Sequence, residues 1–331
     1  MTIGVLLGPQ RLIPTVGEAL EMFKVEGRIA AVTAGWQERE AEDQDLCAAL
    51  GNRSVNLMLH ERGEQVFKDD PNFFAAHRAK QDHLRQLQDL YRLRLASALK
   101  AARRIQQAQA PDALVAAELE EALQALRILD AHHMSKVRQI EAEFERKAKP
   151  LERASVRKQL KEIDVILRGC GAVAIAGGHV AVLYNRLRMF DLRARLLALE
   201  VPIIAWSAGA MAVSDRIVLF HDNPPQGRGN AELMGSGLGL FPGVVVLPHA
   251  RRRLMLNDHA RISVFARRFA TATCIALDER CWIRFDGVRW SAGPNTHQLC
   301  SDGTLIAPNA PRPTGLDPAA PVEWLTTDAP A

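Results

Sequence analysis

The sequence predicts an α/β protein: a three-layer sandwich with a mostly parallel sheet that carries a long inserted α-helical hairpin. Three observations support this fold class. Short apolar runs recur along the chain, as in strands that are buried on both faces of a parallel sheet. Helical patterns separate these runs. Residues 71–165 lack glycine and are rich in Ala, Leu, Arg, Gln, Glu and Lys, which favour helices.

Five apolar runs are the candidate strands, and small or polar residues follow several of them. The expected strands of the core are residues 3–7, 28–32, 172–176, 201–206 and 244–248. The segment between the third and fourth runs, Ala181–Leu199, has a helical pattern. We expect it to form the helix that joins these two strands.

The composition along the chain predicts four segments. Residues 1–70 form the first part of the α/β core, and residues 71–165 form the inserted hairpin. Residues 166–306 complete the core and carry the candidate catalytic motifs. Residues 307–331 are rich in proline and alanine, and we expect this tail to be mostly disordered.

The inserted segment reads as two long antiparallel helices. Apolar residues recur at three-to-four spacing, and Pro111 with Asp112 is expected to start the second helix. Its role is open among internal packing, a dimerisation arm, and a lid or partner-docking arm. Asp130, His132 and His133 resemble metal ligands superficially. Since neighbouring helical residues point in different directions, we interpret them as surface or interface residues.

A buried strand that ends in a serine is the strongest chemical signal. In Ala205-Trp206-Ser207-Ala208-Gly209 the serine is followed directly by small residues. This pattern is typical of a nucleophile elbow, a sharp strand-to-helix turn that exposes a hydroxyl. The usual glycine two positions before the serine is replaced by Ala205. The alternative is a buried strand whose Ser207 merely caps the next helix.

A nucleophilic serine needs a base and an orienting acid. His249 follows the apolar run 244–248, and Asp222 lies in a loop after the apolar residues 217–219. We expect Ser207, Asp222 and His249 to meet at one edge of a single sheet. His221 is the rival base, and Glu279 is the reserve acid.

Several segments together resemble the family of peptidase E, the aspartyl dipeptidase, and cyanophycinase. The serine elbow, the acid loop around Asp222 and the segment that ends in His249 all fit this family. Two later segments, which begin at Leu277 and Ala292, extend the resemblance. The similarity covers roughly residues 170 to 305. The acid loop is Asp222-Asn223-Pro224, and one further motif, Gly239-Leu240-Phe241-Pro242, precedes the segment that ends in His249.

The resemblance implies the class I glutamine amidotransferase-like fold and a Ser-His-Asp hydrolase that cuts a peptide bond next to an acidic residue. A glutamine amidotransferase of this fold would need a cysteine where Ser207 stands. The oxyanion donors implied are the backbone N–H groups of Ala208 and Gly178. The chain departs from the family pattern at Ala176, His179 and Ala250, which puts retained catalysis in question.

Basic residues near the candidate site could select an acidic substrate. Arg251 and Arg252 follow His249, and guanidinium groups bind carboxylates in a bidentate way. His179 is a further candidate substrate contact. Further arginines follow at 253, 261, 267 and 268. The alternative is that these arginines form an ordinary solvated helix face.

Composition limits the remaining functions. The net charge of +4 is mild and gives no nucleic-acid signal. No apolar stretch is long enough to span a bilayer, and no leader is recognised at the N-terminus. The five cysteines are scattered without metal spacing, which suggests reduced thiols in the cytoplasm. We therefore expect a cytoplasmic protein with no cofactor and no metal.

Two functions from different classes remain. The first is a serine hydrolase that acts on a small peptide or amide substrate through an acyl-enzyme, with a homodimer through the helical insertion as a further expectation. The second is a catalytically weak or inactive scaffold whose helical arm binds other proteins. The altered residues Ala176, His179 and Ala250 motivate the second function.

Overall fold

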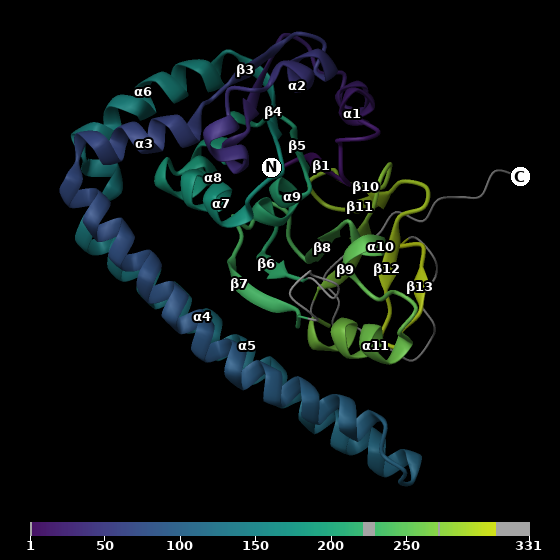
Figure 1. Ribbon diagram of the computed structural model, residues 1–331. Helices are drawn as coiled ribbons and strands as arrows, with labels where there is room; N and C mark the ends of the chain where they lie inside the picture. Colours follow the sequence, from purple (N-terminus) through teal and green to yellow (C-terminus); the bar gives the residue numbers. More distant parts are fainter. Residues whose placement is uncertain (1, 221–228, 271, 309–331) are drawn as a thin grey trace, which may run out of the picture.

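The computed structural model describes residues 2–220, 229–270 and 272–308, and it confirms the α/β fold with a mostly parallel central sheet (Figure 1). The seven strands of this sheet follow the order β11-β10-β1-β5-β4-β2-β3. They are β1 (Gly4–Leu7), β2 (Arg28–Val32), β3 (Ser54–Asn56), β4 (Cys170–Ile175), β5 (Ile203–Trp206), β10 (Trp282–Phe285) and β11 (Trp290–Ala292). Strands β1 to β5 pair in parallel, whereas β10 pairs with β1 and β11 in antiparallel fashion.

The central sheet is buried on both faces. Along β1, Val5 and Leu7 belong to one apolar cluster, and Leu6 between them belongs to another. This alternation reflects the two-residue period of a strand. Helices α1 and α2 cover the first face, and α7 and α9 cover the second. The result is a three-layer sandwich, as the continuous apolar strands predict.

The helices around the sheet are short compared with those of the insertion. They are α1 (Val16–Met22), η1 (Ala34–Arg39), α2 (Gln44–Ala49), α7 (Val180–Met189), α8 (Leu192–Leu199), α9 (Ala208–Val213), α10 (Ala250–Arg253) and α11 (His259–Arg268). The expectation of one helix over Ala181–Leu199 is wrong, because α7 ends before Asp191 and α8 starts after it. Asp191 has a left-handed backbone (φ 43°), which interrupts the helical path.

A second sheet lies beside the first. Its four strands, in the order β13-β12-β9-β8, are β8 (Val244–Pro248), β9 (Thr273–Leu277), β12 (His297–Leu299) and β13 (Leu305–Ile306). Strands β6 (Arg216–Leu219) and β7 (Glu232–Ser236) form a separate antiparallel pair. The run 244–248 is therefore a buried strand as predicted, but the expectation that it shares one sheet with the strand before Ser207 is wrong.

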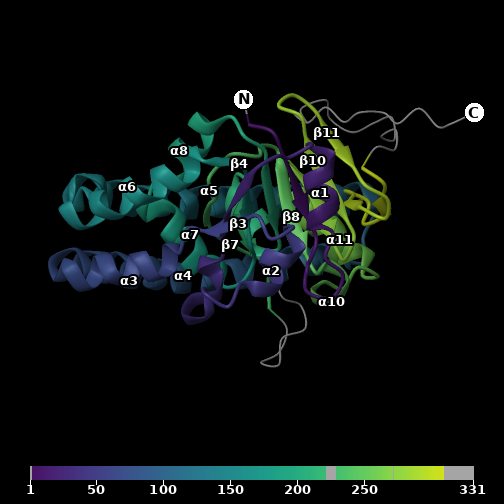
Figure 2. The same ribbon diagram turned by 90° about the horizontal axis from the view of Figure 1, so that it is seen from above.

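The insertion forms two long helices that run side by side along one flank of the body, and their far end projects beyond it (Figure 1). They are α4 (Pro71–Gln106) and α5 (Asp112–Ala148), and α5 begins directly after Pro111. At their base, α3 (Leu59–Asp69), η2 (Pro150–Glu152) and α6 (Ala154–Arg168) connect them to the core. Figure 2 shows α3 and α6 extending together from one side of the body.

A buried polar cluster joins the insertion to helix α11. Arg268 donates to both carboxylate oxygens of Asp130, at 2.6 and 2.7 Å, and to the Tyr91 hydroxyl at 2.7 Å. The ring of His133 stacks on Tyr91 with centroids 4.0 Å apart. His132 is exposed, as expected for a surface residue, but Asp130 and His133 are buried. Of the two predicted placements, surface or interface, Asp130 and His133 take the interface, because α11 covers this face of the hairpin.

The structure was searched for membrane-spanning helices and for groups of metal-binding side chains. In the described part of the chain, no helix combines the length and apolar character needed to cross a membrane. Within the same residues, no three His, Cys, Asp or Glu side chains are grouped to hold a metal ion. The expectation of a disordered tail concerns residues that, from 309 onward, lie outside the described residues.

Candidate active site

Ser207 lies in a tight turn between β5 and α9. Its backbone angles, φ 51° and ψ −122°, are costly for a residue with a side chain. Such strain is common at functional sites, where the surrounding structure holds a residue in an unfavourable conformation. The Ser207 side chain makes no capping hydrogen bond to α9. The hydroxyl is therefore not used to cap the helix, so the alternative role of Ser207 as a helix cap is not supported.

Glycines make the tight turn sterically accessible. A Cβ on Gly209 would lie 2.3 Å from the Ile175 carbonyl oxygen, so α9 packs against β4 at backbone distance. A Cβ on Gly177 would lie 2.7 Å from the Ser207 Cβ and 3.3 Å from the Ala208 nitrogen. The glycine turn after β4 thus lies directly against the serine, as the proposed oxyanion site requires.

We expect Gly177→Ala to impair any chemistry of Ser207. The added Cβ has to displace the serine, and misplacement by about 1 Å costs roughly 100-fold in rate. The measurement is the rate of covalent labelling of Ser207 by a fluorophosphonate. Gly17→Ala is the matched control, since its Cβ would meet its nearest neighbour at an ordinary 3.7 Å. Equal labelling of the two variants would contradict the close packing of Gly177 on the serine.

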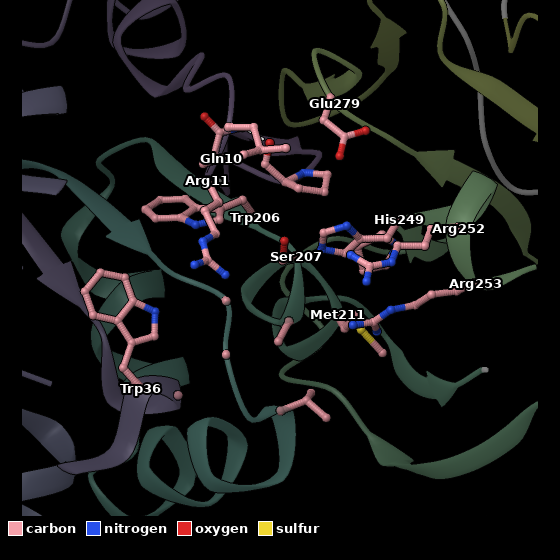
Figure 3. A pocket seen from close by; sticks show the side chains of 18 of the residues that line it. Gln10, Arg11, Trp36, Trp206, Ser207, Met211, His249, Arg252, Arg253 and Glu279 are labelled. Carbon is pink, nitrogen blue, oxygen red and sulfur yellow. Dashed lines mark hydrogen bonds between the residues drawn. The ribbon is translucent and has the colours of Figure 1, made fainter. Parts of the chain in front are cut away.

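His249 lies at the end of β8 and faces the same space as Ser207 (Figure 3). Its backbone is left-handed, with φ 57° and ψ 37°. The His249 N–H donates to the Leu277 carbonyl of β9 at 3.1 Å, and its carbonyl accepts from the N–H groups of Arg252 and Arg253. These bonds to β9 and α10 fix the backbone that carries the imidazole. Ser207 and His249, which belong to different sheets, are brought together.

The surroundings of His249 favour the neutral imidazole. Partial burial lowers the pKa of His249, and the positive charges of Arg253 and Arg252 lower it further. Glu279 acts in the opposite direction and raises this pKa. A neutral imidazole is the form that can accept a proton from a hydroxyl. The charge balance around His249 therefore suits a general base at neutral pH.

The acid of the predicted triad is less well defined. Asp222 and the rival base His221 lie outside the described residues. Glu279, the reserve acid, is exposed and points into the space near His249 (Figure 3). The adjacent Asp278 is buried and accepts a hydrogen bond from the Arg251 N–H at 3.0 Å. Asp278 therefore anchors the start of α10, next to the candidate base.

A cavity of about 1540 Å³ contains the candidate catalytic residues. Ser207, Ala208, Gly178, His249 and Glu279 all line it. Because the cavity lies where β1 and β5 of the central sheet and β8 of the second sheet end, it follows the rule that α/β proteins bind ligands beyond the carboxyl ends of their strands.

The arginines and the histidine predicted to bind substrate are placed differently from one another. Arg252 lines the cavity, whereas Arg251 pairs with Asp278 at 3.7 Å. His179 caps α7 by accepting from the Val182 N–H at 3.3 Å. Among the described residues that line the cavity, Arg251 and His179 do not occur.

Arg267 and Arg268, at the end of α11, form ion pairs with the inserted hairpin. Arg267 pairs with Glu120 of the hairpin at 2.7 Å, and Arg268 pairs with Asp130. A role for these two in binding a substrate carboxylate is therefore wrong, because both dock the insertion on the core.

Several residues that line the cavity are not among the predicted site residues. Gln10 and Arg11 follow β1, Trp36 follows β2, and Met211 belongs to α9 (Figure 3). The side-chain oxygen Oε1 of Gln10 accepts from the Thr15 N–H at 2.6 Å, which holds the loop after β1 in place. Their position in the sequence could have indicated them. The loop with Gln10 and Arg11 follows the predicted strand 3–7, and the loop with Trp36 follows the predicted strand 28–32, at the sheet edge where sites form. Arg253 also lines the cavity.

The comparison with protein families gives the general class of this protein. Residues 130–292 match the family model of peptidase family S51, the family of peptidase E and cyanophycinase. This match confirms the resemblance. It includes Ser207, Asp222, His249 and Glu279. The family supports a peptidase, that is, a hydrolase, as the general class of this protein.

Solved structures also match. A crystal structure of a peptidase from an acI-B1 Actinobacterium is 14% identical, with a TM-score of 0.33, over 51% of this chain and 72% of that chain. No curated protein sequence matches this chain.

Proposed function

We propose that this protein is a serine peptidase or amidase of the S51 type that cleaves a small peptide or amide substrate. One observation carries the proposal: the strained elbow residue Ser207 faces His249 in one cavity, within the stretch that matches the family. The altered residues Ala176, His179 and Ala250 motivated an inactive scaffold as the alternative. We do not favour it, because the serine, the histidine and the glycine turn remain together.

The proposed reaction begins with proton transfer from the Ser207 hydroxyl to the neutral imidazole of His249. The serine oxygen attacks the substrate carbonyl, and the resulting tetrahedral intermediate collapses to an acyl-enzyme as the protonated imidazole gives its proton to the leaving amine. Water, activated by His249, then releases the acid product. A carboxylate would stabilise the imidazolium; Asp222 is the first candidate and Glu279 the second.

The negative oxygen of the intermediate needs backbone donors. The N–H of Ala208, at the start of α9, and the N–H of Gly178, in the glycine turn, are the proposed pair. Both residues line the cavity, and the close packing of Gly177 on Ser207 brings the two segments together. Loss of one such donor typically costs about 3 kcal/mol in transition-state stabilisation.

The charges of the cavity support an acidic group next to the scissile bond. The side chains of Arg11, Arg252 and Arg253 line it. Among the described residues these three guanidinium groups have no ion-pair partner, and Arg253 is partly buried. An unpaired, partly buried guanidinium gains most from binding a carboxylate, which it can hold through two hydrogen bonds. Aspartyl peptides are therefore the first substrates to assay.

Covalent labelling tests the proposed function without knowledge of the substrate. A fluorophosphonate should modify the protein at Ser207, and mass spectrometry of the digested adduct should locate it there. Hydrolysis of aspartyl dipeptides and other small amides by the labelled protein should be lost. An unmodified Ser207, together with no hydrolysis across such a panel, would contradict the proposal.

The pH dependence of this labelling should respond to two charges with opposite sign. Arg253→Gln removes a positive charge that lowers the pKa of His249, so the pKa rises and the acidic limb of the labelling rate moves to higher pH. Glu279→Gln removes a charge that raises this pKa, so the limb moves to lower pH. The two limbs should therefore move apart, one to each side of the parent profile. Two shifts in the same direction would exclude His249 as the titrating base.

A further inference from the structure

The inserted hairpin forms part of the wall of the active-site cavity. Arg92 of α4 lines the cavity that contains Ser207, and so do Asn230 and Glu232 at the start of β7. Helix α4 contacts β7 at several residues, so these two walls are one packed unit. The insertion therefore does more than extend the surface of the protein, because it contributes a charged side chain to the cavity.

The carboxylate of Glu232 is held by two residues of α4 through one of its oxygens. Arg92 Nε donates to Glu232 Oε2 at 2.7 Å, and Gln88 Nε2 donates to the same oxygen at 3.1 Å. Among the described residues, Oε1 has no hydrogen-bond partner. The side chain is largely buried, with 18% of its surface exposed. Glu232 is thus a fixed carboxylate with one oxygen left for a ligand.

The guanidinium that pairs with Glu232 is shared with a second carboxylate. Arg92 also bonds to Asp89 through Nη1 at 3.0 Å, so one guanidinium is shared between two carboxylates. Asp89, Arg92 and Glu232 together carry one net negative charge. Arg92 therefore orients Glu232 without fully neutralising this group of residues.

The backbone that carries Glu232 is fixed on both sides. The Asn230 side chain accepts from Arg103 at 3.1 Å, and the Ala231 carbonyl accepts from Arg268 at 2.7 Å. The Leu233 N–H donates to the Tyr91 hydroxyl at 3.3 Å. Such preorganisation lowers the cost of binding, because little freedom is lost when a ligand arrives.

We propose that Glu232 is a specificity-determining residue that binds a protonated amine of the substrate, and that Arg92 and Gln88 of the hairpin position it. The amine donates a charge-assisted hydrogen bond to Oε1. The inference rests on the proposed function, since it assigns a second recognition group to the same cavity. Combined with the unpaired arginines, it selects a substrate that carries both a free amine and a carboxylate, such as a peptide with an acidic N-terminal residue.

Equilibrium binding to the Ser207→Ala protein tests this proposal separately from catalysis. The probes are aspartyl-leucine and N-acetyl-aspartyl-leucine, which differ in the charged amine, and affinity is measured by titration calorimetry. The Ser207→Ala protein, which is the parent in this experiment, should bind aspartyl-leucine about tenfold more tightly than N-acetyl-aspartyl-leucine. This difference is expected for a hydrogen bond between charged groups. In a Glu232→Gln background this preference should disappear, with little change for the acetylated probe. Failure of the proposed function would instead appear as an unlabelled Ser207.

Arg92→Gln should reduce the same preference several-fold, because Glu232 loses its charged partner and becomes less well oriented. Arg85→Gln is the matched control: it removes an arginine of the same helix that, within the described part of the chain, pairs only with Asp82 on an exposed face. The ratio of the two affinities is the decisive readout, since a merely structural defect would weaken both probes alike. The proposal is overturned if the parent protein lacks the preference, if it does not bind the free-amine probe, or if Glu232→Gln retains the preference.

Discussion

Ser207→Ala should abolish hydrolysis. The expected fall in kcat is about a millionfold, because the serine nucleophile and its base His249 are both needed for the same step. The loss is this large because no other hydroxyl or thiol lines the described part of the cavity. Alanine keeps a Cβ in the strained turn, so it neither relieves nor adds to the backbone cost at φ 51°. The melting temperature and the circular dichroism spectrum should therefore match those of the parent protein.

Two controls make the Ser207→Ala result specific. Ser214→Ala removes a buried serine that bonds to the Met211 and Arg216 carbonyls and does not line the cavity, so fluorophosphonate labelling should persist. Activity that survives in purified Ser207→Ala protein at more than about a thousandth of the parent rate would point to another nucleophile, since a triad member contributes far more.

Arg268→Leu should destabilise the protein by about 3–5 kcal/mol, because it leaves the Asp130 carboxylate buried without its charged partner. Arg268 makes two bonds to Asp130 and one to the Tyr91 hydroxyl, and it also bonds the Ala231 carbonyl. Desolvation is costly for Asp130, which is 6% exposed. The measurement is the free energy of unfolding in urea.

The neighbouring residue provides a matched control for Arg268. Arg267→Leu removes an ion pair between the same two elements, but its partner Glu120 is half exposed, so the loss should stay within about 1 kcal/mol. The double variant Arg268→Leu/Asp130→Leu should recover much of the lost stability, because no unpaired charge remains. Equal destabilisation by Arg267→Leu and Arg268→Leu would show that burial of Asp130 does not determine the effect.

Much of the core could be predicted from the sequence because its strands are short apolar runs with clear boundaries. The run 28–32 matches β2 residue for residue. The hairpin was equally clear, since α4 begins at Pro71 and α5 begins after Pro111. These elements depend on local composition and on proline, which the sequence displays directly.

Features that depend on distant contacts could not be predicted. An apolar run such as 244–248 indicates a buried strand but does not say which sheet it joins. Asp130 and His133 look like surface residues until Arg268 of α11 is placed against them. The break at Asp191 has no glycine or proline to mark it. In each case the tertiary structure overrides the local pattern.

The candidate site was predicted in part for the same reasons. Ser207 and His249 each follow a strand, and strand ends are readable from the sequence. Arg92 and Glu232 were missed because their place in the cavity depends on how a helix of the insertion docks on β7. No periodicity within either segment indicates that contact.

Proton transfer in the proposed reaction crosses a boundary between two sheets, because Ser207 ends β5 of one and His249 ends β8 of the other. The indole N–H of Trp290, in β11 of the first sheet, donates to the carbonyl of Pro242, just before β8 of the second, at 3.3 Å and links the two sides of this boundary. Neither sheet alone holds both partners of the transfer. The proposed activity would therefore depend on the relative position of the two sheets. A slight separation of the sheets would abolish proton transfer and leave the helices and strands intact.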